Sequence, residues 1–220
     1  MKSQREPRSS LILYRLLKWS VVSPMLHTYF RGRVYGVENV PRQGPLVVAS
    51  NHASYFDPPL LSNCTSRPVA FMAKEELFEV PVLNQAIRLY GAYPVKRASA
   101  DRSALRAAIA ALEQGWAVGI FLQGTRTTDA KITEPKLGAA TIAAKLQAPL
   151  LPVSLWGTEK ILVEGSPFPR PVPITVRIGK PIAPPPPRDR AAIEGRHRAG
   201  LQAATDECAA MINKMHDLGR

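Results

Sequence analysis

The sequence is poor in cysteine, shows no repeat at a fixed period and has no glycine-rich loop of the kind that cradles phosphates. Cys64 and Cys208 are its two cysteines, and their spacing matches no metal or redox motif. A reducing, cytosolic environment is the most consistent with this usage. No apolar core leads to a small-residue cleavage site, so a secretory signal is not predicted.

Acidic residues are also scarce relative to basic ones. The chain has 17 Asp and Glu against 29 Lys and Arg, which gives a net charge of +12. Such a balance favours an acidic partner: nucleic acid, anionic lipid, a phosphorylated substrate or an acidic carrier protein. No nucleic-acid-binding module is recognisable, and the aromatic residues cluster near the N-terminus rather than between basic residues, so nucleic acid is not the predicted partner.

The first 32 residues form a basic, amphipathic arm. Its apolar stretch over 9–30 is interrupted by Arg15 and Lys18, and Pro24 should bend or break a helix there. The stretch falls short of the roughly 20 apolar residues that a spanning helix needs. We therefore expect a helix that docks on anionic membrane lipids at the cytoplasmic face without crossing the bilayer. The alternative is an ordinary N-terminal helix packed on the domain.

Strand and helix patterns alternate through the rest of the chain. With 220 residues and 45% hydrophobic content, one globular domain is expected. The predicted strands are 33–37, 46–50, 68–72, 91–95, 116–122, 150–155 and 174–178. The strand over 116–122 is apolar throughout, which predicts a place inside the sheet, and the strand over 174–178 is expected at an edge. The predicted helices are 58–63, 75–78, 82–89, 101–114, 138–147 and 190–216.

This alternation predicts a single-domain α/β fold, an αβα sandwich around a largely parallel central sheet. We expect the chain to divide into the arm over 1–32, a core over 33–180, and a proline-rich connector with a C-terminal helix over 181–220 that packs on the core.

One stretch, from Asn51 to Pro59, follows a buried strand directly. Asp57-Pro58 is typical of a helix start, with Asp as the N-cap and Pro at the first helical position. His52 and Asp57 then lie at the two ends of one turn, where the carboxylate can fix the imidazole tautomer and leave the other nitrogen free as a general base. No activated Ser or Cys is apparent nearby, which suggests that the substrate supplies the nucleophile, most simply a hydroxyl. The alternative is a capping Asp beside a structural His.

Basic residues follow two other predicted strands. Lys96-Arg97 ends the strand over 91–95, and Gln123-Gly124-Thr125-Arg126 follows the strand over 116–122. In a parallel sheet both groups share an edge with His52, where Arg can clamp a phosphate and Gly124 permits close backbone approach. This favours an anionic substrate over a merely solvated basic surface.

Four ordered blocks in the chain resemble those of the glycerolipid acyltransferases, and among these the 1-acylglycerol-3-phosphate acyltransferases most. The resemblance covers roughly residues 35–180. The blocks are Asn-His-x4-Asp from Asn51 to Asp57, Gly91-Ala92-Tyr93-Pro94-Val95-Lys96-Arg97, Phe121-Leu122-Gln123-Gly124-Thr125-Arg126 and Leu151-Pro152-Val153.

The resemblance implies transfer of a fatty acyl group to the free hydroxyl of lysophosphatidate, which gives phosphatidate. His52 would remove the hydroxyl proton, and Asp57 would orient His52 and stabilise the imidazolium. The donor would be acyl-CoA or an acidic acyl carrier protein, with no further cofactor and no metal. The implied substrate-binding residues are Arg97 and Arg126, with Lys96, on the glycerol phosphate, together with Gln123, Gly124, Thr125 and Asn51, the last of which, or nearby amides, would stabilise the oxyanion.

The chain departs from the family in its third block, which usually carries Pro-Glu where this chain has Leu122-Gln123. Gln keeps the size and an acceptor oxygen of Glu but loses the charge. Two alternatives follow: the same chemistry on another acceptor, such as glycerol 3-phosphate or a different lysophospholipid, or a non-catalytic protein that binds anionic lipid.

Overall fold

The computed structural model describes residues 8–74, 78, 79, 81, 84, 87, 92–95, 100–162, 168–187 and 194–220. Most of the predicted helices over 75–78 and 82–89 lies outside the described residues, and so do Lys96 and Arg97.

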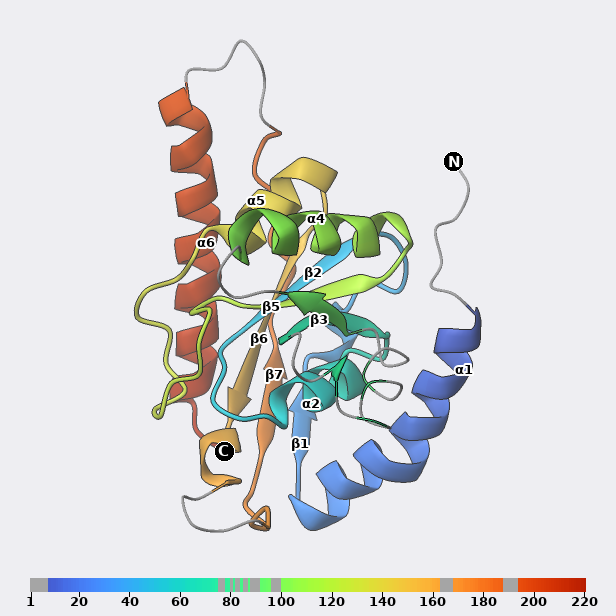
Figure 1. Ribbon diagram of the computed structural model, residues 1–220. Helices are drawn as coiled ribbons and strands as arrows, with labels where there is room; N and C mark the ends of the chain where they lie inside the picture. Colours follow the sequence, from blue (N-terminus) through green and yellow to red (C-terminus); the bar gives the residue numbers. More distant parts are fainter. Residues whose placement is uncertain are drawn as a thin grey trace.

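A seven-stranded sheet forms the centre of the molecule, in the order β1-β7-β6-β2-β5-β3-β4 (Figure 1). Five of the six neighbouring pairs of strands are parallel, and only β6 and β7 pair antiparallel. The strands are β1 (Arg33–Tyr35), β2 (Leu46–Ser50), β3 (Val69–Lys74), β4 (Tyr93–Val95), β5 (Ala117–Phe121), β6 (Leu150–Trp156) and β7 (Thr175–Ile178). The predicted largely parallel sheet is confirmed, as is the interior position of β5.

Helices cover both faces of this sheet, which makes the predicted αβα sandwich (Figure 1). The helices are α1 (Arg8–Leu17), α2 (Asp57–Cys64), α4 (Ala100–Glu113), α5 (Gly138–Leu146) and α6 (Glu194–Asp217). Side chains alternate along β2, so that Val47 and Ala49 pack with α4, α5 and α6, whereas Leu46 and Val48 pack with α2 and the arm. Burial on both faces explains why the first four residues of β2 are all apolar.

The arm is helical from Arg8 to Tyr29, and the prediction that Pro24 breaks or bends it is only partly right. Two π-helical stretches, Lys18–Val22 and Met25–Tyr29, flank Pro24, which itself keeps helical backbone angles. The wider π-turns accommodate a ring that lacks an N–H, so the arm curves along the domain and does not break (Figure 1). No helix among the described residues is long and apolar enough to span a bilayer.

The prediction that the strand over 174–178 lies at an edge is wrong. β7 pairs with β6 on one side and with β1 on the other. The short β1 strand covers it, since the turn at the end of the arm places β1 beside β7: the Phe30 carbonyl accepts the Ile174 N–H, and the Arg33 N–H donates to the Ile174 carbonyl. β1 is the edge on this side of the sheet, and β4 is the edge on the other.

The C-terminal helix packs against α5 and β6. Leu201 and Ile212 are buried, as predicted, and Met211 and Met215 are partly buried against the same core. The connector before the helix is tied to the sheet by two hydrogen bonds between Leu150 and Ile182. This helix also contacts the loop after β5, through Asn213 and Ile132.

Candidate active site

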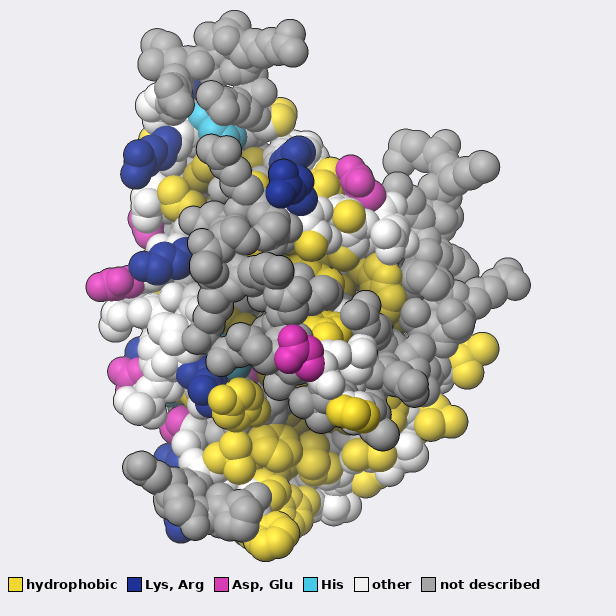
Figure 2. All heavy atoms as spheres, in the orientation of Figure 1, with side chains coloured by type: hydrophobic (Ala, Val, Ile, Leu, Met, Phe, Trp, Pro, Cys, Tyr) yellow, Lys and Arg dark blue, Asp and Glu magenta, His cyan; other side chains and the backbone are white. Residues whose placement is uncertain are grey.

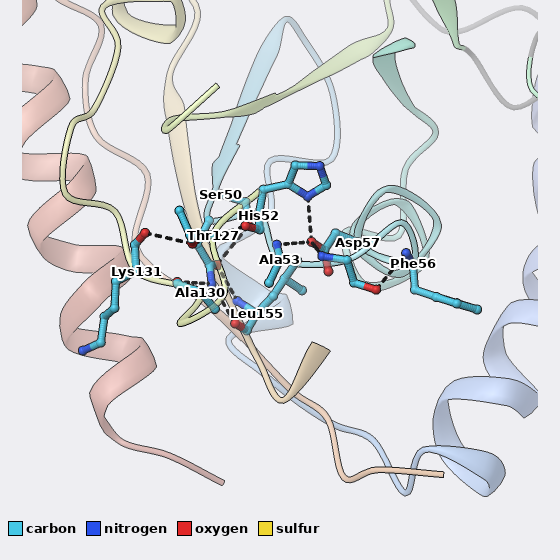
Figure 3. Close-up of polar contacts among 11 residues, drawn as sticks. Ser50, His52, Ala53, Phe56, Asp57, Thr127, Ala130, Lys131 and Leu155 are labelled. Carbon is cyan, nitrogen blue, oxygen red and sulfur yellow. Dashed lines mark hydrogen bonds and ion pairs between the residues drawn. The ribbon is translucent and has the colours of Figure 1, made fainter. Parts of the chain in front are cut away.

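His52 and Asp57 meet in the turn between β2 and α2 (Figure 3). His52 Nδ1 lies 2.7 Å from Asp57 Oδ2, and the Asp57 side chain is fully buried. The same oxygen accepts the backbone N–H groups of Ala53 and Ser54, at 2.7 and 2.8 Å. Three converging donors therefore fix the carboxylate in place before any substrate arrives.

Asp57 is not the N-cap of α2, contrary to the prediction. The cap position is Phe56, and Asp57 is the first residue of the helix. Its side chain turns back to accept the Ala53 and Ser54 N–H groups of the preceding turn. Asp57 therefore acts on His52 and on the turn, not on the helix end.

The His52 ring has one nitrogen engaged and one free. A carboxylate only accepts hydrogen bonds, so the proton shared with Asp57 belongs to Nδ1. The Nε2 atom has no hydrogen bond among the described residues, and the side chain is 18% exposed. Phe121, at the end of β5, stacks on the ring with the centroids 3.8 Å apart. The arrangement can take a proton from an incoming hydroxyl group.

Asn51 joins the end of β2 to the loop after β5 and to β6, and these hydrogen bonds occupy the groups that were predicted to contact substrate. Its Nδ2 donates to the carbonyls of Ala130 and Leu155, both at 2.8 Å, and its Oδ1 accepts the Leu155 N–H at 2.8 Å. The residue is almost fully buried. Both amide protons are thus occupied, so the side chain has none to offer an oxyanion.

The turn after β5 brings Arg126 to the site. Gly124 adopts a left-handed conformation, with φ of 77°, which makes the tight turn possible. The Thr127 N–H then donates to the His52 carbonyl at 2.9 Å and joins the two turns. The exposed Arg126 donates to the Tyr55 hydroxyl at 3.0 Å, and its guanidinium lies 3.8 Å from the centre of the Tyr55 ring.

Thr125 and Gly124 are exposed beside Arg126. The structure therefore brings Gly124, Thr125 and Arg126 next to the His52 turn, as the sequence predicts for the ends of parallel strands. The other predicted basic pair, Lys96 and Arg97, follows β4, and both residues lie outside the described part of the chain.

Gln123 makes its hydrogen bonds to the loop that follows β5. Its Oε1 accepts the backbone N–H groups of Thr133 and Glu134, both at 3.0 Å, and its Nε2 donates to the Thr133 hydroxyl at 3.3 Å. Gln123 therefore holds the loop over 127–136 against the end of β5. A Glu could make the same two acceptor bonds, so the departure from the family's usual residue preserves this contact.

The far side of that loop is fastened to α6. Asn213 exchanges two hydrogen bonds with the backbone of Ile132, and Lys131 forms an ion pair with Asp217. The hydrogen bond from Lys131 lowers the pKa of Asp217. The C-terminal helix thus supports the loop that carries the site, a link between residues 81 to 86 positions apart that periodicity in the sequence cannot show.

Comparison with known proteins identifies the same region. A family model described as "Acyltransferase" matches residues 31–156. A chloroplast 1-acyl-sn-glycerol-3-phosphate acyltransferase of Brassica napus is 32% identical over 67% of this chain and 43% of its own length. The 1-acyl-sn-glycerol-3-phosphate acyltransferase of Bacillus subtilis is 34% identical over 57% of this chain and 62% of its own.

A solved structure resembles the whole described fold. The 1-acyl-sn-glycerophosphate acyltransferase PlsC of Thermotoga maritima has a TM-score of 0.63 and is 27% identical, with 92% of this chain and 86% of that one covered. By contrast, the chain spans less than half of the length of the plant relative. The family match over residues 31–156 includes the turn after β2 and the turn after β5, which carry the site.

Proposed function

Because this chain belongs to the acyltransferase family, we propose that it moves a fatty acyl group from an acyl thioester to the free hydroxyl of 1-acylglycerol 3-phosphate, giving phosphatidate. The observation that carries the proposal is the 2.7 Å contact between His52 Nδ1 and a buried Asp57 carboxylate, with Nε2 left free. The relatives' names supply the acceptor.

The reaction needs one base and no protein nucleophile. His52 Nε2 takes the proton from the acceptor hydroxyl while its oxygen attacks the thioester carbonyl carbon. The tetrahedral oxyanion then collapses, the carbon–sulfur bond breaks, and the thiolate leaves with the proton carried by the imidazolium. Asp57 stabilises the positive charge on His52 between these two steps. The products are phosphatidate and the free thiol of coenzyme A or of an acyl carrier protein.

Arg126 is the group that we assign to the acceptor phosphate. It is exposed, it lies on the turn joined to the His52 carbonyl through Thr127, and a guanidinium can hold a phosphate with two hydrogen bonds. Gly124 and Thr125 lie on the same turn. Lys96 and Arg97 complete the phosphate-binding set in this proposal, on the strength of the family's second block alone.

The N-terminal arm would deliver the enzyme to its lipid substrate. One side of the arm packs on the domain through Tyr14, Val22 and Leu26. The opposite side leaves Ile12, Leu16 and Trp19 between 59% and 69% exposed at helical spacing. Figure 2 shows hydrophobic side chains projecting from the edge of the molecule where Figure 1 places the arm.

This arrangement combines the two alternatives of the sequence analysis, a packed helix and a docking helix. Lys18 belongs to the packed side, because its Nζ donates to the Asn63 carbonyl at 2.9 Å, and burial lowers its pKa. The apolar side chains, not Lys18, would enter the bilayer, and the net charge of +12 would favour anionic lipid. We place the docked enzyme at the cytoplasmic face.

The acceptor is tested by thiol release from oleoyl-coenzyme A and from an oleoyl carrier protein. Lysophosphatidate, glycerol 3-phosphate and lysophosphatidylcholine are compared. We expect release that depends on lysophosphatidate, and a KM for it that rises at least tenfold in Arg126→Ala and less in Arg126→Lys. A preference for glycerol 3-phosphate would redirect the assignment to another acceptor. Vesicle binding without release on any acceptor and donor would favour the non-catalytic alternative.

Docking is tested by sedimentation with vesicles of phosphatidylglycerol or of phosphatidylcholine. Trp19→Ser should lower binding to phosphatidylglycerol vesicles about tenfold, because an indole that enters the bilayer loses its transfer free energy. The matched control is Leu218→Ser, which alters an equally exposed apolar side chain after α6. Equal losses in both variants would contradict docking through the arm.

A further inference from the structure

The face of the His52 ring is covered by an aromatic side chain. The His52 and Phe121 rings are nearly parallel, with centroids 3.8 Å apart and an interplanar angle of 11°. Phe121 ends β5 and is the register partner of Ser50 in β2, two residues before His52. The pairing of β2 with β5 therefore delivers one ring to the other.

Phe121 is itself supported from behind. The Phe71 ring lies 5.8 Å from the Phe121 ring at 21°, and Phe71 is 5% exposed, so it has little room to move. Phe71 in β3 is the register partner of Gly119 in β5. Gly119 and Phe121 share a face of β5, because side chains alternate along a strand.

A glycine is needed at 119 for this stack to exist. A Cβ atom there would lie 2.1 Å from Phe71 Cε1, far inside van der Waals contact. The Phe71 ring thus occupies the space over Gly119 and reaches Phe121 from there. Gly119, Phe71, Phe121 and His52 form one continuous column, which we call the aromatic column.

We propose that Phe121 is a positioning residue for His52 in the acyl transfer proposed above, held by Phe71 across Gly119. The hydrogen bond to Asp57 fixes one edge of the imidazole but leaves the ring able to swing about that bond. The flat contact with Phe121 removes this freedom and aims Nε2 at the acceptor hydroxyl. An aromatic face also favours the imidazolium that forms during the reaction.

The kinetic test separates positioning from binding. A residue that acts through His52 alone changes kcat and not KM, so Phe121→Leu should lower kcat at least tenfold and leave KM for lysophosphatidate within twofold. Phe121→Tyr keeps a flat ring and should restore kcat to within threefold of wild type. Gly119→Ala, which displaces Phe71, should lower kcat without touching His52.

Loss of packing alone is controlled by Leu112→Ala. Leu112 is buried in α4 on the other face of the sheet, so this variant loses stability without disturbing the aromatic column. Its kcat should stay at the wild-type value below its unfolding temperature. An unchanged kcat in Phe121→Leu, or a loss in Phe121→Tyr as large as in Phe121→Leu, would overturn the proposal.

A second readout does not require turnover. Imidazole carbon-bound protons above a benzene ring are shifted upfield, and the His52 signal is assigned by its disappearance in His52→Gln. We expect the upfield shift in wild type and Phe121→Tyr and its loss in Phe121→Leu; a His52 signal that does not move in Phe121→Leu would overturn the stacking. Absence of thiol release in wild type would instead contradict the proposed function, so the two failures are distinguishable.

Discussion

Replacing Asp57 by Asn separates the charge of the carboxylate from its geometry. The Asn carbonyl oxygen can take the place of Oδ2 and accept the same N–H groups from Ala53, Ser54 and His52. The amide group then replaces Oδ1, which is buried and has no hydrogen-bond partner among the described residues. Hydrogen bonds to a charged acceptor are stronger than those to a neutral one, so the free energy of unfolding of Asp57→Asn should fall by about 1–3 kcal/mol.

The effect on turnover should be larger than the effect on folding. A carboxamide that forces the wrong imidazole tautomer lowers kcat by about 10⁴ in a serine protease triad. Here the Asn carbonyl can still accept the Nδ1 proton, so only the negative charge beside the imidazolium is lost. We expect kcat to fall by about 10²- to 10³-fold, or about 3–4 kcal/mol in activation free energy.

The assay is thiol release at saturating acceptor, with urea denaturation of the same preparations. The matched control is Asp129→Asn, which neutralises an exposed carboxylate in the loop that carries the site and should leave kcat unchanged. A kcat for Asp57→Asn within threefold of wild type would refute the role of Asp57 as the partner of a base. A rise in KM with unchanged kcat would refute it equally.

Four further outcomes follow from particular contacts. Asn51→Ala should lower the free energy of unfolding by about 3 kcal/mol or more in urea denaturation, because three buried backbone groups lose their partner. Gln123→Glu should keep kcat/KM within about threefold of wild type, whereas Gln123→Ala should lower it by loosening the loop. Burial lowers the pKa of His216, so the unfolded chain protonates this imidazole at a higher pH than the folded protein does. The free energy of unfolding should therefore fall between pH 7.5 and pH 5.5, and it should fall less steeply in His216→Leu. Burial raises the pKa of the Cys64 and Cys208 thiols to about 12, so a thiol reagent at pH 8 should label neither until the protein is unfolded.

Local patterns in the sequence were sufficient for most of the fold. The strand over 46–50 is a short apolar run between a turn and a helix start, and the structure gives β2 the same bounds. The helix over 101–114 follows its apolar stripe to within one residue. These elements are decided by periodicity and by residues next to one another, which the sequence displays directly.

The errors concern partners that are distant along the chain. Whether the strand over 174–178 is an edge depends on β1, about 140 residues earlier. An Asp before a Pro is typical of a cap, but the direction of the Asp57 side chain is decided by the N–H groups of the preceding turn. The hydrogen-bond partners of Asn51 were not predictable for the same reason, because they lie 79 and 104 positions away.

The contact between His52 and Phe121 could not be predicted either, although both residues belong to blocks that the sequence displays. It requires that β2 and β5 be neighbours in a fixed register, and no local pattern contains that information. Phe121 is readable as an apolar residue that ends a strand, and this property is common. Only the fold makes it the neighbour of the candidate base.

Mass spectrometry of the lipid product tests whether His52 is the base of an acyl transfer to lysophosphatidate. Purified wild-type protein and His52→Ala are each given oleoyl-coenzyme A, an oleoyl carrier protein and lysophosphatidate in vesicles. We predict diacylated phosphatidate from the wild type with at least one donor, and no product above background from a folded His52→Ala. Equal product from both proteins would contradict the assignment of His52 as the base.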